Sequence, residues 1–322
     1  MNARGDGFKL GLSVYPQETT WEALAAVVAR ADELGFDSLW SWDHLLGIGA
    51  DGRQPVFEAW TTVAAWATIT RRATVGLLVS ANTFRNPGLV AKCAVTIDHI
   101  SGGRFVLGLG AAYRELEHRT YGFDFGSGFG ERLAWLDESV DAVRRLLAGE
   151  TVSSPPGGRY RIENATQAPL PLRGPGTIPV LIPGAGERKT LPILARHGDA
   201  WHVRGTVETL LHKLELLAGY CERSGRSLDS IELITGNPVV IRDDPFEAEA
   251  VYDAIVSRNG QTRTGSVIER AAGTFLGGPP ELIAEAWRPF VEIGFRHMVV
   301  DFAAPHDRET LERLPEVRAL LA

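Results

Sequence analysis

The chain has 322 residues, more than a usual domain but within the range of an α/β barrel, which commonly takes about 250 residues plus insertions. Hydrophobic residues make up 44% and charged residues 23%, which is typical of a globular protein and excludes disordered, collagen-like and coiled-coil chains. With 33 Lys and Arg against 40 Asp and Glu, the formal net charge is −7. Because binding to the phosphate backbone of a nucleic acid needs a basic surface, this balance argues against nucleic acid as a partner.

The cysteine content and the hydropathy pattern exclude further classes of protein. Cys93 and Cys221 are far apart and lie in no metal-binding spacing, so we expect neither a disulfide scaffold nor a metal site. No segment approaches the roughly 18 apolar residues of a membrane span, and the first eight residues lack the apolar run of a signal peptide. The sequence therefore predicts a soluble, cytoplasmic protein that does not enter a membrane.

In the first half of the chain, short β-branched runs alternate with stretches of helical periodicity. Leu24, Val28 and Ala31, for example, recur at three- and four-residue intervals and place an apolar stripe on a helix that ends near Gly35. Strands are predicted over residues 9–14, 38–42, 74–79 and 105–109, and helices over residues 21–35, 59–69, 89–100 and 133–147.

Residues 150–178 break this alternation, because they are rich in Pro and Gly and have no periodicity. A stretch of this length indicates an insertion on the active-site face or a linker. Afterwards strands are predicted over residues 180–182, 200–203, 233–241 and 297–301, with helices from residue 188, over 207–224, from 245 and over 279–293. We expect one (β/α)8 TIM barrel over residues 1–322, with an insertion after the fourth βα unit.

The competing architecture is a doubly wound sheet that binds a dinucleotide. Its glycine fingerprint fails here, because Gly108 and Gly110 are followed by Tyr113 where the third glycine belongs. The eight expected strands also exceed the usual number for such a sheet. The barrel is therefore the favoured interpretation.

The reactive groups of a barrel lie where its strands end, and Asp43 and His44 follow the second strand. His44 is a candidate to transfer a proton near neutral pH, and a structural histidine that bonds a loop carbonyl is the alternative. Asp43 would either orient a ligand or cap the loop, and a cap is the more common role.

Two glycine-rich loops follow later strands. Apart from Leu109, residues 108–112 are Gly or Ala, so their backbone either approaches a flat ligand or packs tightly against the strands. Pro183, Gly184, Ala185 and Gly186 lead into a helix that begins with Arg188 and Lys189. A helix N-terminus of this kind binds anions, so we favour a phosphate site over a plain tight turn.

The most specific motif runs from residue 86 to residue 104, NPGLVAK through TIDHISGGR, and continues into Gly108-Leu109-Gly110. Residues 115–118, 121–122 and Arg132 extend it, and a second motif covers residues 182–189 and 198–201. With these motifs the chain resembles the luciferase-like monooxygenase superfamily, specifically its branch of oxidoreductases that use the deazaflavin coenzyme F420. The resemblance covers nearly the whole chain.

The resemblance implies a (β/α)8 barrel that holds F420, or alternatively FMN, at its C-terminal rim, often as a homodimer. It implies that His44 is the acid or base beside the reactive ring. It also matches Leu78 and Val79 to a bulge where many members carry a non-prolyl cis peptide bond. The cofactor-binding residues that it implies are Asp43, Leu78, Val79, Gly110, Ala111, Ala112, Tyr113, Pro183, Gly184, Ala185, Gly186 and Arg188.

The chain departs from the family pattern at Tyr113, the position of the acidic glutamate in sugar-phosphate dehydrogenases of this class, so a sugar phosphate is a doubtful substrate. We expect hydride transfer between deazaflavin C5 and a small organic substrate, either in reduction of an imine or enone or in oxidation of an alcohol. An FMN-dependent monooxygenase and a non-catalytic cofactor-binding subunit are the alternatives. Further candidates are Asn82, Arg85 and Tyr113 in the pocket, Arg85, Arg114, Arg119 and Arg204 in a cationic groove, and residues 121–130 as a lid.

Overall fold

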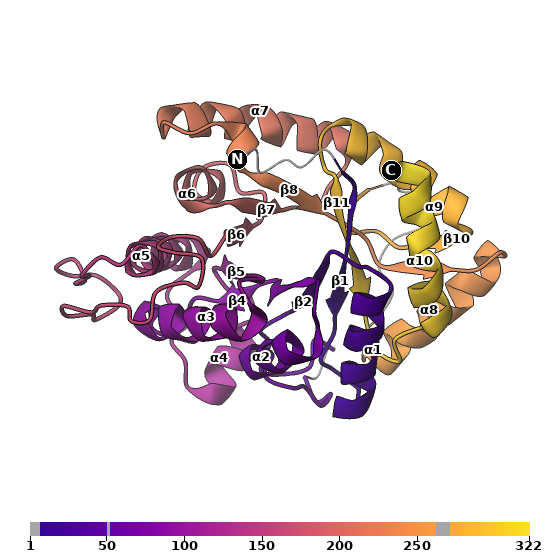
Figure 1. Ribbon diagram of the computed structural model, residues 1–322, viewed down its shortest axis with the longest axis horizontal. Helices are drawn as coiled ribbons and strands as arrows, with labels where there is room; N and C mark the ends of the chain where they lie inside the picture. Colours follow the sequence, from indigo (N-terminus) through magenta and orange to yellow (C-terminus); the bar gives the residue numbers. More distant parts are fainter. Residues whose placement is uncertain (1–6, 50–51, 262–270) are drawn as a thin grey trace.

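The computed structural model describes residues 7–49, 52–261 and 271–322. Within these ranges, eight parallel strands form a closed barrel, in which the pairing of β3 with β5 completes the ring (Figure 1). The predicted (β/α)8 barrel is therefore confirmed. The barrel strands are β1 (Lys9–Val14), β2 (Ser38–Ser41), β3 (Thr74–Leu77), β5 (Phe105–Gly110), β6 (Val180–Pro183), β7 (Ala200–His202), β8 (Glu232–Thr235) and β11 (His297–Phe302).

Helices surround the ring of strands on its outside (Figure 1). Their ends follow local chemistry: α3 begins after Asn86, whose side chain accepts the N–H of Gly88, and ends at Gly102 with a φ of 69°. In the described ranges, none of them has the length and apolar character that a membrane crossing requires. The helices are α1 (Trp21–Glu33), α2 (Ala59–Ile69), α3 (Pro87–Ser101), α4 (Glu115–Tyr121), α5 (Phe129–Leu147), α6 (Thr190–His197), α7 (Val207–Arg223), η1 (Leu228–Ser230), α8 (Pro245–Arg258), α9 (Pro280–Glu292) and α10 (Arg308–Leu321).

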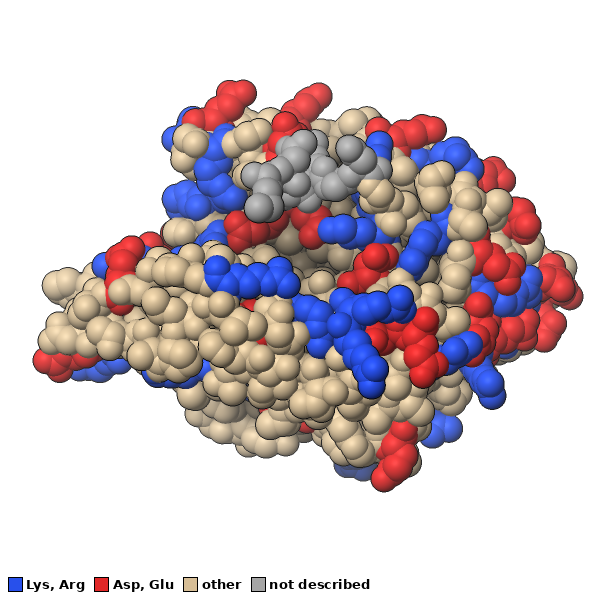
Figure 2. Space-filling view, viewed as in Figure 1, with Lys and Arg blue, Asp and Glu red and all other residues tan. Residues whose placement is uncertain are grey.

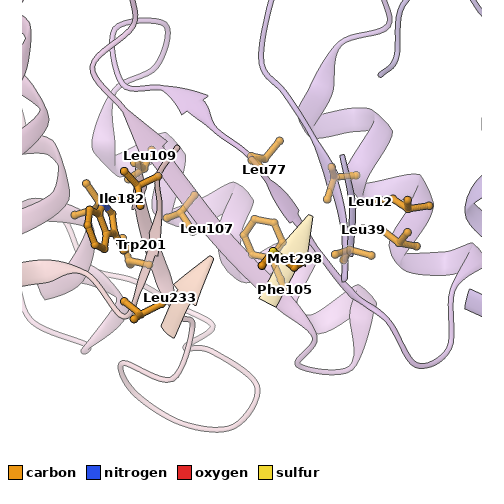
Figure 3. Packing of buried hydrophobic residues seen from close by; sticks show 14 of the residues in the cluster. Leu12, Leu39, Leu77, Phe105, Leu107, Leu109, Ile182, Trp201, Leu233 and Met298 are labelled. Carbon is orange, nitrogen blue, oxygen red and sulfur yellow. The ribbon is translucent and has the colours of Figure 1, made fainter. Parts of the chain in front are cut away.

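The main hydrophobic core lies between the barrel and these helices. Because successive side chains of a strand point to opposite faces, every barrel strand contributes outward-facing apolar residues to it. Complete burial of each such side chain contributes roughly 1.5–3 kcal/mol. Figure 3 shows Leu12, Leu39, Leu77, Phe105, Leu107, Leu109, Ile182, Trp201, Leu233 and Met298 in this layer.

A second, smaller core fills the inside of the barrel. Trp40, Leu181, Ala200, Ile234 and Val299 come from five different strands and are almost fully buried. Leu78, Val79 and Val106 pack against them. This cluster closes the barrel and forms the floor on which any ligand at the mouth rests.

A polar network continues from this inner core toward the N-terminal ends of the strands. The Ser38 hydroxyl accepts the indole N–H of Trp40 at 2.7 Å and lies 2.7 Å from Nε2 of His297. Oε1 of Glu232 lies 3.1 Å from Nδ1 of His297 and 2.7 Å from Nζ of Lys9. Burial alone would raise the pKa of Glu232, but His297 and Lys9 outweigh it and lower that pKa to about 2.

Two predicted strands need correction. The strand expected over residues 233–241 is broken into β8 and β9 (Val239–Ile241), and β9 pairs with β10 (Leu276–Gly278) in a separate small sheet. At the break, the backbone of Gly236 approaches β11 so closely that a Cβ would lie 1.8 Å from the carbonyl oxygen of Val299. Pro238 follows and has no N–H to donate to the barrel ladder.

The strand expected over residues 74–79 ends earlier, at Leu77. The peptide bond between Leu78 and Val79 is cis, and the chain then forms the short β4 (Ser80–Ala81), which pairs with β5. The helix expected from residue 188 begins at Thr190.

Residues 148–179, all of which the structure describes, contain no helix or strand beyond a single bridge between Val152 and Ala165. They extend beside α5 in Figure 1. The Tyr160 hydroxyl anchors them to the barrel by donating to the carbonyl of Asn82 at 2.8 Å, and burial raises the pKa of this phenol to about 12. On the face seen in Figure 2, acidic and basic side chains are interspersed over α8, α9 and α10, whereas the area over α3 and α4 is mostly uncharged.

Replacement of Glu232 by Gln is expected to lower the free energy of unfolding at pH 7 by about 2 kcal/mol, because it removes the charged acceptor that His297 and Lys9 share. A carboxylate whose pKa is depressed in the folded state stabilises it above the unfolded pKa of 4.5 and loses this effect as the pH falls toward 2. Urea unfolding of both proteins at pH 7 and pH 3 measures the difference, which should shrink at pH 3. An equal difference at the two pH values would contradict the role given to Glu232.

Candidate functional site

The C-terminal ends of the barrel strands surround a cavity of about 630 Å³. The loops after β2, β3, β5 and β6, where sequence analysis placed most candidate residues, form part of its wall, and residues in or after β1, β7 and β11 also contribute to it. Of those candidates, the structure brings together around the cavity Asp43, His44, Leu78, Val79, Gly110, Ala111, Ala112, Tyr113, Pro183, Gly184, Ala185 and Gly186.

His44 lies between two partners that come from the same later segment of the chain. Its Nδ1 is 3.0 Å and 3.1 Å from the two carboxylate oxygens of Glu117, at the first turns of α4. Its Nε2 is 3.3 Å from the hydroxyl oxygen of Tyr113. The imidazole thus bridges a buried carboxylate and a phenol at the cavity wall.

The environment of Glu117 fixes the direction of these hydrogen bonds. Its carboxylate also accepts the backbone N–H groups of Leu45 at 3.0 Å and Leu46 at 3.2 Å. Burial would raise the pKa of Glu117, but the hydrogen bonds from His44 and these amides hold it below its usual value. The ionised carboxylate accepts Nδ1–H, so a neutral His44 presents the lone pair of Nε2 to Tyr113 and the cavity.

Asp43, the acidic neighbour of His44 in sequence, has a different partner. Its fully buried carboxylate accepts the Ser80 hydroxyl at 2.7 Å and pairs with Arg85, whose Nη1 lies 2.5 Å away. Arg85 also pairs with Glu58 at 2.7 Å. Asp43 therefore holds the end of β2 against β4, and Arg85 lies behind the wall rather than in the pocket or groove for which it was a candidate.

The loop after β6 lines the cavity and is fixed to β7 by hydrogen bonds of its backbone. Gly184 has a φ of 104°, its N–H donates to the His202 carbonyl at 3.0 Å, and its own carbonyl accepts the Trp201 indole N–H at 2.8 Å. A Cβ on Gly186 would lie 2.7 Å from the hydroxyl oxygen of Thr190, which lines the cavity in the first turn of α6. Backbone N–H groups at such a helix start suit an anionic phosphate.

The two cations predicted beside this loop do not reach the cavity wall. Arg188 is exposed and is absent from the lining formed by the described residues. Lys189 donates to the carbonyl of Gly130 at 2.8 Å and so connects the start of α6 to the start of α5. Phe129, at the end of the candidate lid segment, does line the cavity.

Of the remaining pocket and groove candidates, some line the cavity and others do not. Asn82 is buried against Tyr160 of the insertion and, among the described residues, does not contribute to the cavity lining. Arg114 donates to the carbonyl of Gly49 at 3.0 Å, and Arg119 is exposed. Arg204 alone of this group lines the cavity.

On the side of the cavity opposite the β5 loop, the groove candidate Arg204 lies with three groups that sequence analysis did not identify, Tyr15, His202 and Asp301. Nη2 of Arg204 lies 2.7 Å and 2.6 Å from the two carboxylate oxygens of Asp301. Burial lowers the pKa of His202 to about 3, with Arg204 adding to the effect, so this imidazole is neutral. Burial also raises the pKa of Tyr15 well above its usual value, and Asp301 adds to the shift.

Comparison with known proteins places the chain in a family. The chain matches the luciferase-like monooxygenase family over residues 8–297. An F420-dependent glucose-6-phosphate dehydrogenase of Intrasporangium calvum is 29% identical, over 97% of this chain and 99% of its own length. A Mycobacterium tuberculosis protein that carries coenzyme F420 in its name is 31% identical, over 61% of this chain and 55% of its own length.

A solved structure shows the same fold. An F420-dependent secondary alcohol dehydrogenase in complex with an F420-acetone adduct superposes with a TM-score of 0.82 at 18% identity, covering 98% of this chain and 99% of its own. The match to the family covers most of the chain, and the dehydrogenase that matches it over nearly its full length is an oxidoreductase. The chain therefore belongs to the luciferase-like monooxygenase family and is an enzyme of that family.

Proposed function

We propose that this enzyme is an F420-dependent oxidoreductase that transfers a hydride between C5 of the deazaflavin and a small organic substrate. The observation that carries the proposal is the similarity, over nearly the full length of the chain, to dehydrogenases named for F420. When bound, the deazaflavin would supply the carbon that accepts or donates the hydride, and the protein would supply orientation and proton control.

The residues around the cavity fit such a cofactor. Leu78 and Val79 would form the wall behind its ring, and the backbone of residues 110–113 would run along its middle. Gly110 keeps this approach open, since a Cβ there would already lie 2.7 Å from Cγ2 of Val79. Gly184, Gly186 and the first turn of α6 would hold the phosphate through backbone N–H groups.

His44 is the residue that we assign to proton transfer. Its Nε2 faces the cavity side, and Glu117 fixes the ring from behind through Nδ1. An imidazole held in this way gives or takes the proton that accompanies each hydride. This arrangement also supports a catalytic barrel over the alternative of a non-catalytic cofactor-binding subunit.

FMN is the alternative cofactor, because it shares the phosphate and the ring shape, and it would make the chain a flavin-dependent monooxygenase. The names of the relatives that match most of the chain favour F420 over FMN. A homodimer and a cytoplasmic location, both expected from sequence, stay predictions of this proposal.

Titration of the purified protein with F420 and, separately, with FMN tests the cofactor directly. We expect F420 fluorescence to change saturably at micromolar concentrations, while FMN binds at least tenfold more weakly. The same titrations in air and without oxygen follow the cofactor absorbance. Saturable FMN binding with no response to F420 would overturn the proposed cofactor.

Replacement of Gly184 by Val is expected to weaken F420 binding by about tenfold or more, because a side chain at a φ of 104° strains the loop that would hold the phosphate. The matched control is Gly174→Val, at a φ of 112° in the insertion and away from the cavity. Both changes should cost about 1–3 kcal/mol of stability. Equal F420 affinity in the two variants would argue against the phosphate site.

Replacement of His44 by Asn is expected to lower kcat by about 100-fold or more, because the proton-transfer group is lost. F420 affinity should stay within about threefold, since the residues assigned to the ring and phosphate are unchanged. The control is His212→Asn on the outer helix α7, where the side chain is 57% exposed. A kcat for His44→Asn within threefold of the unmodified enzyme would exclude this role for His44.

A further inference from the structure

The hydroxyl of Tyr113 is the outermost member of the hydrogen-bonded series that begins at Glu117. Glu117 accepts from Nδ1 of His44, and Nε2 of His44 lies 3.3 Å from the Tyr113 oxygen. In the imidazole form with its proton on Nδ1, Nε2 has only a lone pair to offer, and the phenol is the donor in this bond. The phenol oxygen then keeps its own lone pairs free to accept a proton or a hydrogen bond from a ligand.

Tyr113 is also placed where a ligand reaches it. Its side chain is 70% exposed and lines the cavity mouth in the loop after β5. Burial of its inner part raises the pKa of the phenol, with Glu117 adding to the rise and Arg114 and Arg204 opposing it. The phenol therefore keeps its proton at neutral pH and enters any reaction as O–H.

The charges around the cavity indicate whether the substrate beside this phenol is charged or neutral. Arg204 is the one Lys or Arg among the described lining residues, and both carboxylate oxygens of Asp301 already contact it. His202 is neutral, as its low pKa requires. The described part of the cavity lining thus contains no unpaired Lys or Arg for a phosphate or carboxylate of the substrate.

Aromatic rings line the cavity beside the imidazole. Trp42 packs edge-on against His44 with ring centres 5.1 Å apart, and Tyr15 packs against Trp42 at 5.5 Å. Both rings belong to the cavity wall. Such a surface favours contact with an apolar substrate skeleton.

We propose that Tyr113 is the catalytic residue that exchanges a proton with the substrate oxygen, that His44 and Glu117 act behind it, and that the substrate is a neutral alcohol or the corresponding carbonyl compound. This inference rests on the proposed function, because it assigns the proton that accompanies the hydride. It narrows the reaction to the alcohol and carbonyl pair and leaves imine and enone reduction aside.

For an alcohol, the C–H bond of the carbinol carbon would break and its electron pair would leave with hydrogen as hydride, for which a bound deazaflavin would supply the acceptor carbon. The O–H bond of the substrate breaks, its proton goes to the Tyr113 oxygen, and its electron pair forms the second C–O bond. The original phenol proton passes at the same time to Nε2 of His44, where the carboxylate of Glu117 stabilises the resulting imidazolium.

Replacement of Tyr113 by Phe keeps the ring and removes the hydroxyl. With F420 and a neutral alcohol such as cyclohexanol or 1-phenylethanol, we expect kcat to fall about 100-fold or more while KM and F420 affinity stay within about threefold. The matched control is Tyr121→Phe, since the Tyr121 hydroxyl donates to the Leu45 carbonyl of the same loop and does not contact His44. This control should keep the activity of the unmodified enzyme.

The double variant Tyr113→Phe, His44→Asn tests whether the two residues act in series. If they do, its loss in kcat equals that of the more impaired single variant, whereas independent actions would multiply the two losses. Glucose 6-phosphate is the anionic comparison substrate, and we expect its kcat/KM to be at least tenfold below that of the neutral alcohol.

Fluorescence titration with F420 distinguishes a failure of the proposed function from a failure of the inference about Tyr113. Failure of the unmodified protein to bind F420 would refute the proposed function. Normal binding, together with a Tyr113→Phe variant that retains kcat within threefold, multiplied losses in the double variant, or a preference for glucose 6-phosphate, would refute the inference about Tyr113 and leave the proposed function standing.

Discussion

The geometry of the site depends on one buried carboxylate. Glu117 is 2% exposed, and its two oxygens accept the imidazole Nδ1–H of His44 and the backbone N–H groups of Leu45 and Leu46. An ionised carboxylate without partners would be very costly in this position, and hydrogen bonds to a charged acceptor are worth about 1.5–3 kcal/mol each. These hydrogen bonds therefore hold residues 44–46 in the conformation that places Nε2 of His44 beside Tyr113 at the cavity.

A second buried carboxylate, that of Asp43, fixes the start of the same loop. Asp43 binds Ser80 and Arg85, and so attaches the end of β2 to β4 immediately after the Leu78–Val79 bond. The two neighbours thus have separate partners: Asp43 bonds Ser80 and Arg85 in the wall, and His44 bonds Glu117 and Tyr113. The ion pair of Asp43 with Arg85 is shielded from solvent, and removal of either partner would leave the other buried and uncompensated.

The sequence predicts the barrel well because the period of apolar residues changes from strand to helix and back at every unit. The strand predicted over residues 233–241 failed because Gly236 and Pro238 sit inside an apolar run, and hydrophobic pattern alone does not register a backbone approach to Val299. Sequence analysis gave Asp43 the role of orienting a ligand or capping the loop, and it named no partner for His44. Glu117 is 73 residues away from His44 and meets it only when the barrel closes, although its place in the motif over residues 115–118, directly after the β5 loop, was a usable signal.

Arg188 was predicted to bind the phosphate because the helix start was placed at residue 188, two residues too early. The helix begins at Thr190, and Thr190 lines the cavity in place of Arg188. Tyr113 shows how one departure from a family pattern changes the chemistry that a site supports. A carboxylate at this position could accept a hydrogen bond, but when ionised it could not donate one to Nε2 of His44. A phenol does both, so it connects the imidazole to the substrate oxygen without adding a second negative charge beside Glu117. The series from Glu117 through His44 to Tyr113 would thereby form a proton path suited to neutral substrates.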